Sequence, residues 1–473
     1  MRVLLTHSYF LRYDPKQWKL MQPYAPLGTL YAAAVLRESG YEVALHDVMF
    51  ADGPDSIEVA LNNFKPQALV IYDDGFNYLT KMCLTNMREM AFELIRFGKA
   101  YGCTVVVSSS DATDHAVNYL EVGADFIIIG EGEQTLVELM DAIESDISPW
   151  DVPGLCYKGA SGQVVHTAAR PVMHNLEHLP MPAWDLADME RYRDAWMART
   201  GYFSVNVSTT RGCPFRCNWC AKPIYGNRYN VRSPASVVNE LIYLKEKYQF
   251  DHVWFCDDIF GLKPGWIQEF ANLVYAAQLR LRFKIQSRAD LLLKEQQITP
   301  LALSGCETVW IGAESGSQRI LDAMDKGITT QQISDATTML KRHGVRVAYF
   351  IQFGYLGETQ ADIEATLNMV RQNMPDDVGI SVSYPLPGTK YFDKVKEQLD
   401  GKANWSRSDD LDMLFQNTFS TAYYRGLYKY LHACLRKLRA KKGVGFSLKK
   451  TLSIPYYALQ ERRYRRLINK LAK

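Results

Sequence analysis

The first 146 residues alternate short apolar runs with segments whose apolar residues recur every three or four positions. The runs predict five strands: Val3–Thr6, Glu42–His46, Ala68–Tyr72, Thr104–Ser108 and Phe126–Ile129. The periodic segments predict five helices: Leu27–Glu38, Ser56–Phe64, Leu79–Ala100, Asp111–Val122 and Glu133–Glu144. Strands that are apolar throughout and alternate with helices are typical of a doubly wound, Rossmann-like parallel sheet, and ligands of such sheets bind beyond the carboxyl ends of the strands.

The same alternation returns after residue 201. Six apolar runs predict strands, each followed by a helical pattern: Tyr202–Ser208, Val253–Phe255, Arg282–Gln286, Thr308–Ile311, Arg346–Phe350 and Val378–Val382. Six strand–helix units are too few to close an eight-stranded barrel. We therefore expect a partial (β/α)6 barrel of TIM type, with its active residues at the carboxyl ends of the strands.

Prolines and charge mark the other boundaries. Residues 149–200 are rich in proline and indicate a linker with a hairpin, Leu155–Lys158 with Val164–Thr167. The α/β class thus divides into a domain at 1–148, this linker, a core at 201–395 and a basic helical region at 396–473. In that last region Tyr423–Arg439 and Ile454–Leu471 have helical spacing.

The net charge of +2 is unevenly distributed. From Ala422 to Lys473 there are 15 Lys or Arg and one acid, which leaves 39 basic and 51 acidic residues, a net −12, for the remainder. Three interpretations of the tail stay open: a solvated helical cap on the barrel, a helix on an anionic membrane surface, and contact with a phosphorylated substrate or RNA. Because the tail has no recognised RNA module, nucleic acid is not an expected partner.

The cysteine usage indicates a reducing compartment. Nine cysteines are an odd number and six are scattered singly, so no disulfide framework is indicated. No run of 18 apolar residues and no signal peptide are evident. We expect a cytoplasmic protein, with membrane association through the basic tail as one option.

The other three cysteines lie in one short segment, Thr209–Cys220, as Cys213, Cys217 and Cys220. Thiolates select iron–sulfur clusters or zinc, and structural zinc needs a fourth ligand that does not follow at finger spacing. Three thiolates can hold three irons of a cubane cluster and leave the fourth iron open, with Trp219 placed to cover a cofactor there. A zinc knuckle and incidental core cysteines are the alternatives.

This C-x3-C-x-aromatic-C pattern resembles the signature of the radical S-adenosylmethionine (SAM) enzymes. The resemblance implies a [4Fe–4S] cluster whose open iron binds the amino and carboxylate groups of SAM. One electron then splits SAM, and the 5′-deoxyadenosyl radical abstracts hydrogen from an unactivated carbon.

Two segments of the N-terminal domain, Pro26–Leu36 and Gly130–Thr135, resemble the cobalamin-binding domain that precedes many radical SAM cores. Gly130 and Gly132 allow the backbone to approach a bulky ligand closely, and hydroxyls from Ser108 to Ser110 are placed at a strand end to bind it. A flavodoxin-like domain without ligand is the alternative. No Asp-x-His-x-x-Gly loop exists, and we interpret the histidines as ordinary polar or capping residues rather than cobalt ligands: His7, His46 and His115.

Four strand-end motifs of the core resemble SAM-contacting elements of the family. Asp257 and Asp258 are assigned to the SAM amino group or its neighbours, with surface carboxylates or a helix cap as the alternative. Arg288 is assigned either to the SAM carboxylate or to an ion pair with Glu314. Glu314, in a G-x-E-S-G-S-like element, is assigned to the ribose or amino group.

The fifth strand ends at Gln352 in a turn that resembles G-x-P-G-E-T and would approach adenine. In this turn Glu358-Thr359 is expected to cap the next helix. Two further interpretations are structural: Cys256 as a small buried hydrophobe, and Tyr384–Thr389 as a rigid turn.

The first functional hypothesis is a cobalamin-dependent radical SAM enzyme that transfers a methyl group to an unactivated carbon. It implies an electron donor such as flavodoxin or ferredoxin and a small-molecule or lipid substrate. The alternative outcome is oxidative cyclisation or rearrangement, as in the anaerobic magnesium-protoporphyrin cyclase group. A methylthiotransferase-like tRNA modifier would need a second cysteine triad, whereas the N-terminal domain holds only Cys83 and Cys103. A non-catalytic iron–sulfur scaffold or sensor is the last alternative.

Overall fold

The computed structural model describes residues 1–399, 401–442 and 448–472. The chain forms two compact units. The first contains Met1–Pro214, Ala221–Arg282 and Asn404–Asp410, and the second contains Phe215–Cys220, Phe283–Ala403 and Leu411–Lys473.

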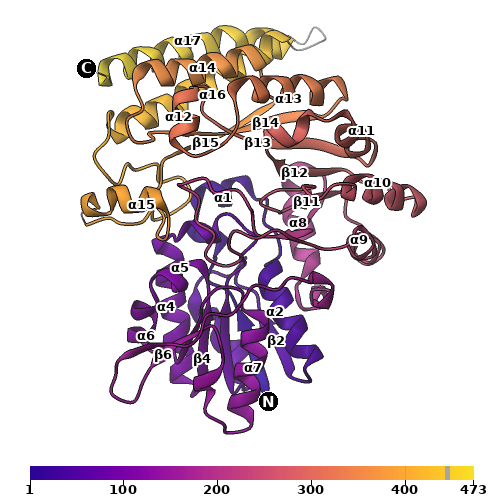
Figure 1. Ribbon diagram of the computed structural model, residues 1–473, viewed down its shortest axis with the longest axis vertical. Helices are drawn as coiled ribbons and strands as arrows, with labels where there is room; N and C mark the ends of the chain where they lie inside the picture. The colour runs from indigo at the N-terminus through magenta and orange to yellow at the C-terminus, as the bar shows by residue number, and fades with distance from the viewer. Residues whose placement is uncertain (400, 443–447, 473) are drawn as a thin grey trace. The chain divides into compact units, whose positions relative to one another are not determined.

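The N-terminal part of the first unit is built on a seven-stranded sheet of order β2-β1-β3-β4-β5-β6-β7 (Figure 1). Its strands are β1 (Arg2–Thr6), β2 (Glu42–His46), β3 (Ala68–Tyr72), β4 (Thr104–Ser108), β5 (Phe126–Ile128), β6 (Leu155–Lys158) and β7 (Val164–His166). The first five pair in parallel. Their 2-1-3-4-5 order is that of flavodoxin-like sheets, which bind ligands at the carboxyl ends of the strands.

Helices cover both faces of this sheet because successive strand residues point to opposite sides. On one face, α2 (Leu27–Glu38) and α7 (Glu133–Glu144) pack on a core that includes Val3, Leu5 and Val70. On the other, α3 (Ile57–Phe64), α4 (Thr85–Ala100) and α6 (Ala116–Val122) pack on a core that includes Leu4, Leu69 and Ile71. The sequence prediction of a doubly wound sheet is confirmed.

Two details differ from the prediction. The hairpin β6–β7 extends the sheet as antiparallel strands instead of standing apart in a linker. Two predicted helices are each divided: Leu79–Ala100 at Cys83, whose φ is 51°, and Asp111–Val122 at His115, between α5 (Ser110–Asp114) and α6. A left-handed residue cannot continue a right-handed helix.

The core is a six-stranded parallel partial barrel, with strands in the order β15-β14-β13-β12-β11-β8. The first unit supplies β8 (Ser204–Val207) and β11 (His252–Phe255), and the second supplies β12 (Phe283–Ser287), β13 (Cys306–Glu314), β14 (Arg346–Phe353) and β15 (Asp377–Val382). The helices that follow them in sequence are α9 (Pro234–Tyr248), α10 (Trp266–Ala276), α11 (Glu295–Leu303), α12 (Gln318–Ala323), α13 (Thr330–Arg342), α14 (Gln360–Asn373) and α15 (Lys390–Val395). The predicted α/β class and partial barrel are confirmed.

A small antiparallel ribbon follows β8 and was not predicted. It consists of β9 (Thr210–Arg211) and β10 (Asn230–Val231), with Arg211 opposite Asn230. The ribbon therefore closes the base of the loop 212–229, which contains the three clustered cysteines.

The chain ends in two long helices, α16 (Thr421–Lys442) and α17 (Leu448–Leu471). Figure 1 shows α17 beside α14 and α16 in the second unit. One face of α16 is buried, including Tyr423, Leu427 and Leu431, so this helix is a cap on the second unit. Within the described residues, no helix is long and apolar enough to cross a membrane.

Candidate cofactor sites

A pocket lies at the carboxyl ends of β3 and β4, where flavodoxin-like sheets bind ligands. Tyr72 and Asp73 line it from β3, and Ser108–Ser110 line it from β4. The remaining wall includes Ile224 and Tyr225, which belong to the loop closed by the β9–β10 ribbon. The segment that carries the cysteines therefore continues directly into the wall of the N-terminal pocket.

The glycine turn between β5 and α7 forms a cradle beside this pocket. A Cβ atom on Gly132 would lie 2.8 Å from the Tyr72 hydroxyl oxygen and 3.1 Å from the Ser108 hydroxyl oxygen, so no larger residue fits there without movement. Gly130 has φ of 79°, which only glycine adopts freely. The predicted residues Ser108 and Gly132 thus meet at one place, where glycine lets the turn pack closely against two residues that line the pocket.

The histidines of the N-terminal domain lie outside the pocket lining. His7 Nε2 is 2.9 Å from Asp47 Oδ1, and His46 Nε2 is 3.1 Å from the Ser56 hydroxyl. His115 follows α5, and its Nε2 is 3.9 Å from Asp111. His7 and His46 thus have the expected polar contacts, whereas the buried Nε2 of His115 has no hydrogen-bond partner among the described residues.

The three clustered cysteines form no disulfide within the described chain, and Cys213 is buried while Cys217 and Cys220 are half-buried. In the described part of the chain, no three His, Cys, Asp or Glu side chains gather as ligands of one metal ion. The chemistry of the donor set suits a cluster: three thiolates bind three irons of a cubane and leave the fourth iron open, whereas structural zinc needs a fourth ligand that does not follow at finger spacing.

Asn218, between Cys217 and Cys220, anchors the loop in the second unit. Its backbone N–H donates to Met324 O (3.0 Å) and its carbonyl accepts from Tyr391 N (2.9 Å). Its side-chain amide donates to Ala323 O (2.7 Å), and the amide oxygen accepts from the Tyr355 hydroxyl (2.9 Å). Both the backbone and the amide of this residue are thus committed to holding the cysteine segment.

Asp257, at the end of β11, is buried and binds the strand end that leads to the cysteines. Its carboxylate accepts from Thr209 N (2.7 Å), Thr209 Oγ1 (2.5 Å) and Thr210 N (2.8 Å). Burial raises the pKa of Asp257 to about 6, although these hydrogen bonds lower it. Asp258 is more exposed and forms an ion pair with Lys81 at 2.8 Å. The structure gives Asp257 a positioning role, and its assignment to the SAM amino group stays a prediction.

Arg288 and Glu314, two predicted SAM contacts, do not pair with each other. Arg288 pairs with Asp290 (3.0 Å), donates to Lys326 O (2.8 Å), and lies 3.7 Å from the centroid of the Phe215 ring. The predicted alternative of an Arg288–Glu314 ion pair is therefore wrong. The reason is local: Asp290 is two residues away, and Glu314 already has another cation.

That cation is Lys326, whose ammonium lies 2.7 Å from Glu314 Oε1 with both side chains buried. Burial would lower the pKa of Lys326, but the Glu314 carboxylate raises it above its ordinary value. Glu314 ends β13 with φ of 56°, a left-handed conformation that is rare for a residue with a side chain. Such strain is typical of functional strand ends.

Trp219 and Gln352 complete the predicted set in the second unit. The Trp219 ring lies 6.0 Å from the Lys326 ammonium, and its buried indole N–H has no hydrogen-bond partner among the described residues. A buried donor without a partner fits a position beside a bound cofactor. Gln352 donates to the Ser383 hydroxyl at 2.9 Å.

The turn after Gln352 corrects one expectation. Thr359 caps α14 as predicted, but its partner in the capping box is Asp362 and not Glu358. Glu358 is fully buried, and one of its oxygens accepts from Gly354 N at 2.7 Å. Burial raises the pKa of Glu358 to about 8. The turn Tyr384–Thr389 ends in the cap of α15, where Thr389 accepts from Phe392 N.

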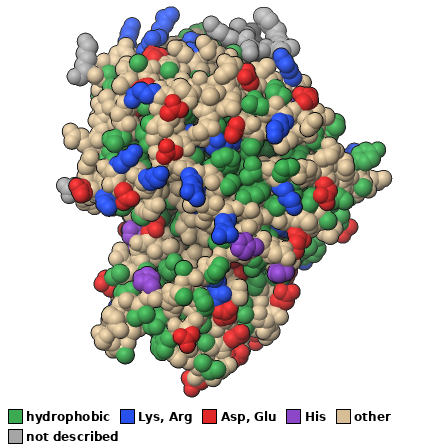
Figure 2. Space-filling model, viewed as in Figure 1, with side chains coloured by type: hydrophobic (Ala, Val, Ile, Leu, Met, Phe, Trp, Pro, Cys, Tyr) green, Lys and Arg blue, Asp and Glu red, His purple; other side chains and the backbone are tan. Residues whose placement is uncertain are grey.

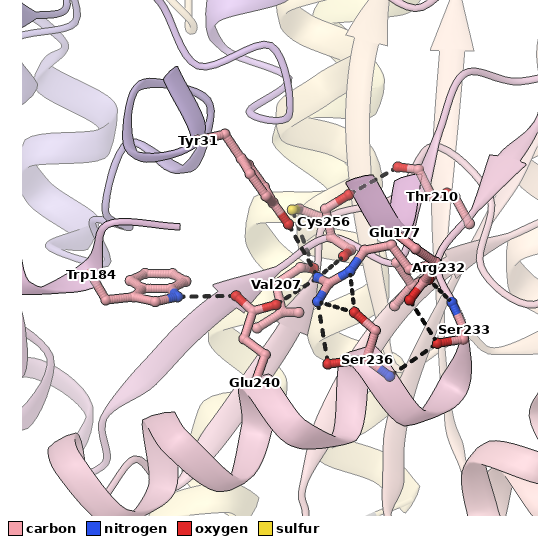
Figure 3. Close-up of polar contacts among 12 residues, drawn as sticks. Tyr31, Glu177, Trp184, Val207, Thr210, Arg232, Ser233, Ser236, Glu240 and Cys256 are labelled. Carbon is pink, nitrogen blue, oxygen red and sulfur yellow. Dashed lines mark hydrogen bonds and ion pairs between the residues drawn. The ribbon is translucent and has the colours of Figure 1, made fainter. Parts of the chain in front are cut away.

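Two buried arginines flank the cysteine loop, and both were missed from the sequence. Arg211, on β9, pairs with Glu131 (2.5 Å) and Glu133 (2.6 Å) of the glycine turn. Arg232, just after β10, pairs with Glu240 of α9 at 2.5 Å and donates to the Tyr31 hydroxyl at 3.1 Å (Figure 3).

The Arg211 partners are about 80 positions away in the sequence, so no local pattern reveals the pair. The only available signal was the acidic pair inside the glycine turn. Lys326 and Asn218 were missed for the same reason: their partners are separated from them in the sequence and come next to them only in the folded chain.

Two family models match the chain, and their ranges include the residues of both candidate sites. The B12 binding domain model matches residues 19–140, and the radical SAM superfamily model matches residues 207–370. Together they span well over half of the sequence. The chain belongs to the radical SAM superfamily and is an enzyme with an N-terminal B12-binding domain. Its cofactors are a [4Fe–4S] cluster, SAM and cobalamin.

Individual relatives resemble the chain over half to nearly all of its length. An uncharacterized methyltransferase of Pyrococcus horikoshii is 28% identical over 402 residues, 82% of each chain. The anaerobic magnesium-protoporphyrin IX monomethyl ester cyclase of Rubrivivax gelatinosus is 26% identical over 285 residues, 58% of this chain and 50% of that protein. The structure of OxsB, a cobalamin-dependent SAM radical enzyme with aqua-cobalamin bound, covers 98% of this chain and 72% of its own, with a TM-score of 0.76 and 17% identity. That last likeness supports the fold.

Proposed function

We propose that this enzyme methylates an unactivated carbon of a small-molecule or lipid substrate. The observation that carries the proposal is the continuity of the two sites along the chain: Ile224 and Tyr225 follow the cysteines within a few residues and line the pocket of the cobalamin domain. Methyl transfer through cobalamin requires the two cofactors to serve one substrate. The methyltransferase relative, aligned over 82% of this chain, supports the same outcome.

The cofactors would supply the radical and the methyl carrier, and the protein would position them. Cys213, Cys217 and Cys220 would hold the cluster. The Trp219 N–H, the Glu314–Lys326 pair and Gln352 would orient SAM, while Asp257 and Asn218 keep the cysteine segment in place. The cradle of Gly130 and Gly132, with Ser108, would hold the corrin.

Each product would consume two SAM molecules and two electrons. One SAM yields methionine and a deoxyadenosyl group, which takes the substrate hydrogen to become 5′-deoxyadenosine. The other gives up its methyl group and leaves as S-adenosylhomocysteine. A low-potential donor of the flavodoxin or ferredoxin class would supply the electrons.

Oxidative cyclisation or rearrangement is the second candidate, because a cyclase of this architecture is 26% identical over 285 residues. A product assay separates the two. The anaerobically reconstituted enzyme is given SAM, reductant, hydroxocobalamin and a host-cell metabolite extract, with Cys217→Ala as control. Accumulation of both 5′-deoxyadenosine and S-adenosylhomocysteine supports methyl transfer. Deoxyadenosine without S-adenosylhomocysteine contradicts it and supports cyclisation.

A further inference from the structure

The base of the cysteine loop carries a buried ionic network. Arg211 and Arg232 lie at the two ends of the loop that the β9–β10 ribbon closes, and they are 3% and 7% exposed. Three carboxylates serve the two guanidinium groups: Glu131, Glu133 and Glu240. The network is therefore part of the interior and not a set of surface pairs.

Tyr31 joins the two arginines. It projects from α2 of the cobalamin domain, and its hydroxyl accepts from Arg232 while its ring centroid lies 5.3 Å from the Arg211 guanidinium carbon. Figure 3 shows Arg232 between Tyr31 and Glu240, with Trp184 donating to the other oxygen of Glu240. Both ends of the loop are thus fixed to the N-terminal domain through one aromatic side chain.

Arg211 contacts both a residue of the pocket wall and the glycine turn beside the pocket. Its guanidinium lies 4.9 Å from the ring centroid of Tyr225, which lines the pocket, and it binds both acids of the glycine turn. Its two terminal guanidinium nitrogens hold one carboxylate each in a rigid planar geometry, which the compact, rotatable ammonium of a lysine does not reproduce. Arg211 is two residues before Cys213, so any shift of the glycine turn reaches a cluster ligand through one side chain.

We propose that Arg211 and Arg232 are positioning residues that couple the cobalamin site to the cluster. Changes made at the glycine turn alter the environment of the cluster, and changes made at Arg211 alter the affinity for cobalamin. The coupling is reciprocal, as linkage between two binding sites requires. The proposal rests on the two cofactors and is independent of whether the product is methylated.

The test uses the holoenzyme and two readouts that need no substrate. The cobalamin dissociation constant is measured by absorbance titration, and the reduced cluster is examined by electron paramagnetic resonance with and without SAM. Arg211→Lys should weaken cobalamin binding by about fivefold or more, within the usual range of site coupling. Glu133→Gln should change the resonance of the cluster although it is far from the cysteines in sequence.

Arg170→Lys is the matched control. Arg170 binds Thr135 at 2.6 Å and also pairs with Glu138, so it holds the same helix α7 without touching the loop. It should lower the melting temperature and leave both readouts unchanged. Tyr31→Phe is a milder variant that removes only the hydroxyl and keeps the ring. The proposal is overturned if both readouts are unchanged in Arg211→Lys and Glu133→Gln, or if Arg170→Lys changes them equally.

A second, independent observation concerns the surface of α17. Six exposed residues fall on one face at helical spacing: Tyr456, Leu459, Arg462, Arg463, Arg466 and Lys470. Ile468, on the opposite face, is buried and lies against Gly426 of α16. The exposed fractions of Tyr456 and Leu459, 57% and 67%, are large for apolar side chains.

The face is basic without compensation in the described part of the chain. Glu461, the one acid after Ala422 in the sequence, points away from it and pairs with Lys437. Among the described residues, no ion pair engages Arg462, Arg463, Arg466 or Lys470. Figure 2 shows Lys and Arg side chains along the edge where α17 lies. The remaining chain carries net −12, so the tail is the part that an anionic surface attracts.

We infer that this face of α17 binds an anionic lipid bilayer. Arginine and lysine meet lipid phosphates, and Tyr456 and Leu459 enter the headgroup boundary, which is how amphipathic interfacial helices bind. The exposed Leu459 favours a bilayer over RNA, because an RNA backbone offers it no apolar partner. The occupant is thus a membrane surface and not a nucleic acid.

Vesicle sedimentation tests this inference with the full-length holoenzyme. Binding to vesicles with roughly a third phosphatidylglycerol should exceed binding to pure phosphatidylcholine, and high salt should reverse it. Reversal of Arg462, Arg463, Arg466 and Lys470 to Glu should lower binding about tenfold or more, since each charge near the surface contributes appreciably.

The matched control reverses four exposed charges elsewhere: Lys19, Lys158, Arg280 and Lys294. It should bind as the wild type does. Equal loss in both variants, or no preference for the anionic vesicles, overturns the inference. Binding of RNA by the enzyme without binding of vesicles also overturns the inference and assigns the face to nucleic acid.

Discussion

Lys326 and Glu314 form a buried ion pair of 2.7 Å at the end of β13, beside the ring of Trp219. Removal of one partner leaves an uncompensated buried charge, which costs about 3–5 kcal/mol. We expect Lys326→Met to lower the free energy of unfolding by about that amount and to weaken SAM binding. Urea unfolding and equilibrium dialysis with SAM measure the two effects. The double variant Lys326→Met with Glu314→Gln should recover most of the stability; equal losses in the single and double variants would contradict the pair.

Gly132 predicts a specific defect in cobalamin binding. An alanine Cβ there meets the Tyr72 hydroxyl at 2.8 Å, so the turn must move away from the pocket. Gly132→Ala should weaken cobalamin binding about tenfold while the iron content stays unchanged. Removal of the hydroxyl in Gly132→Ala with Tyr72→Phe should restore part of the affinity. Unaltered binding in the single variant would show that this turn does not form the cradle.

Glu358 predicts a pH dependence of stability. Its pKa is raised to about 8 by burial, so the folded protein binds a proton that the unfolded chain releases near its ordinary pKa. Its contribution is therefore present below that ordinary value and is lost as the pH rises toward 8. A tenfold change in the proton affinity of one group corresponds to about 1.4 kcal/mol, so the loss of stability amounts to a few kcal/mol.

The neutral isostere Glu358→Gln should remove this dependence. Comparison of unfolding midpoints between pH 5 and 8 isolates the residue, because Asp257 and the other groups titrate in both proteins. The variant should gain stability relative to the wild type as the pH rises. Parallel pH profiles would mean that Glu358 is not protonated in the folded enzyme.

Asn218 predicts a fragile cluster. Asn218→Ala removes the side-chain hydrogen bonds to the Ala323 carbonyl and the Tyr355 hydroxyl but leaves the backbone hydrogen bonds of residue 218. We expect lower iron and sulfide content after reconstitution and faster loss of the cluster in air. Tyr355→Phe, which removes one of those bonds, should have a smaller effect. Full iron content and normal stability in Asn218→Ala would refute the anchoring role.

The cysteines themselves divide into two classes. Alanine at Cys213, Cys217 or Cys220 should abolish cluster assembly, whereas Cys256→Ala should retain it. Cys256 is buried and its thiol contacts Val207 O at 3.4 Å, as expected of a small hydrophobe. Iron analysis and absorbance near the cluster bands distinguish the classes. Loss of iron in Cys256→Ala would place a fourth thiol at the cluster.

Periodicity predicted the regular elements well because they depend on local pattern. The strands Glu42–His46, Ala68–Tyr72 and Thr104–Ser108 begin and end where the apolar runs do. The break at Cys83 was missed, since a left-handed residue other than glycine gives no sequence signal. The hairpin was predicted, but its addition to the sheet edge depends on pairing with β5 and not on its own sequence.

The sequence predicts the ligands of the candidate site but does not reveal the residues that support them. The cysteine spacing and the glycine turn are local motifs, so the sequence alone indicates both cofactors. Arg211, Arg232 and Lys326 are ordinary basic residues until folding brings Glu131, Glu240 and Glu314 to them. Their roles depend on contacts between residues that are separated in the sequence, and no local pattern in a single sequence predicts such contacts.

Isotope transfer tests the central claim most directly. The reconstituted enzyme is incubated with SAM whose methyl group is fully deuterated, with reductant, cobalamin and host-cell extract, and new products are identified by mass spectrometry against Cys217→Ala. The account predicts a product that carries the intact trideuteriomethyl group on carbon, formed together with 5′-deoxyadenosine. A product formed with deoxyadenosine but without the label would contradict methyl transfer and assign the enzyme to the cyclases.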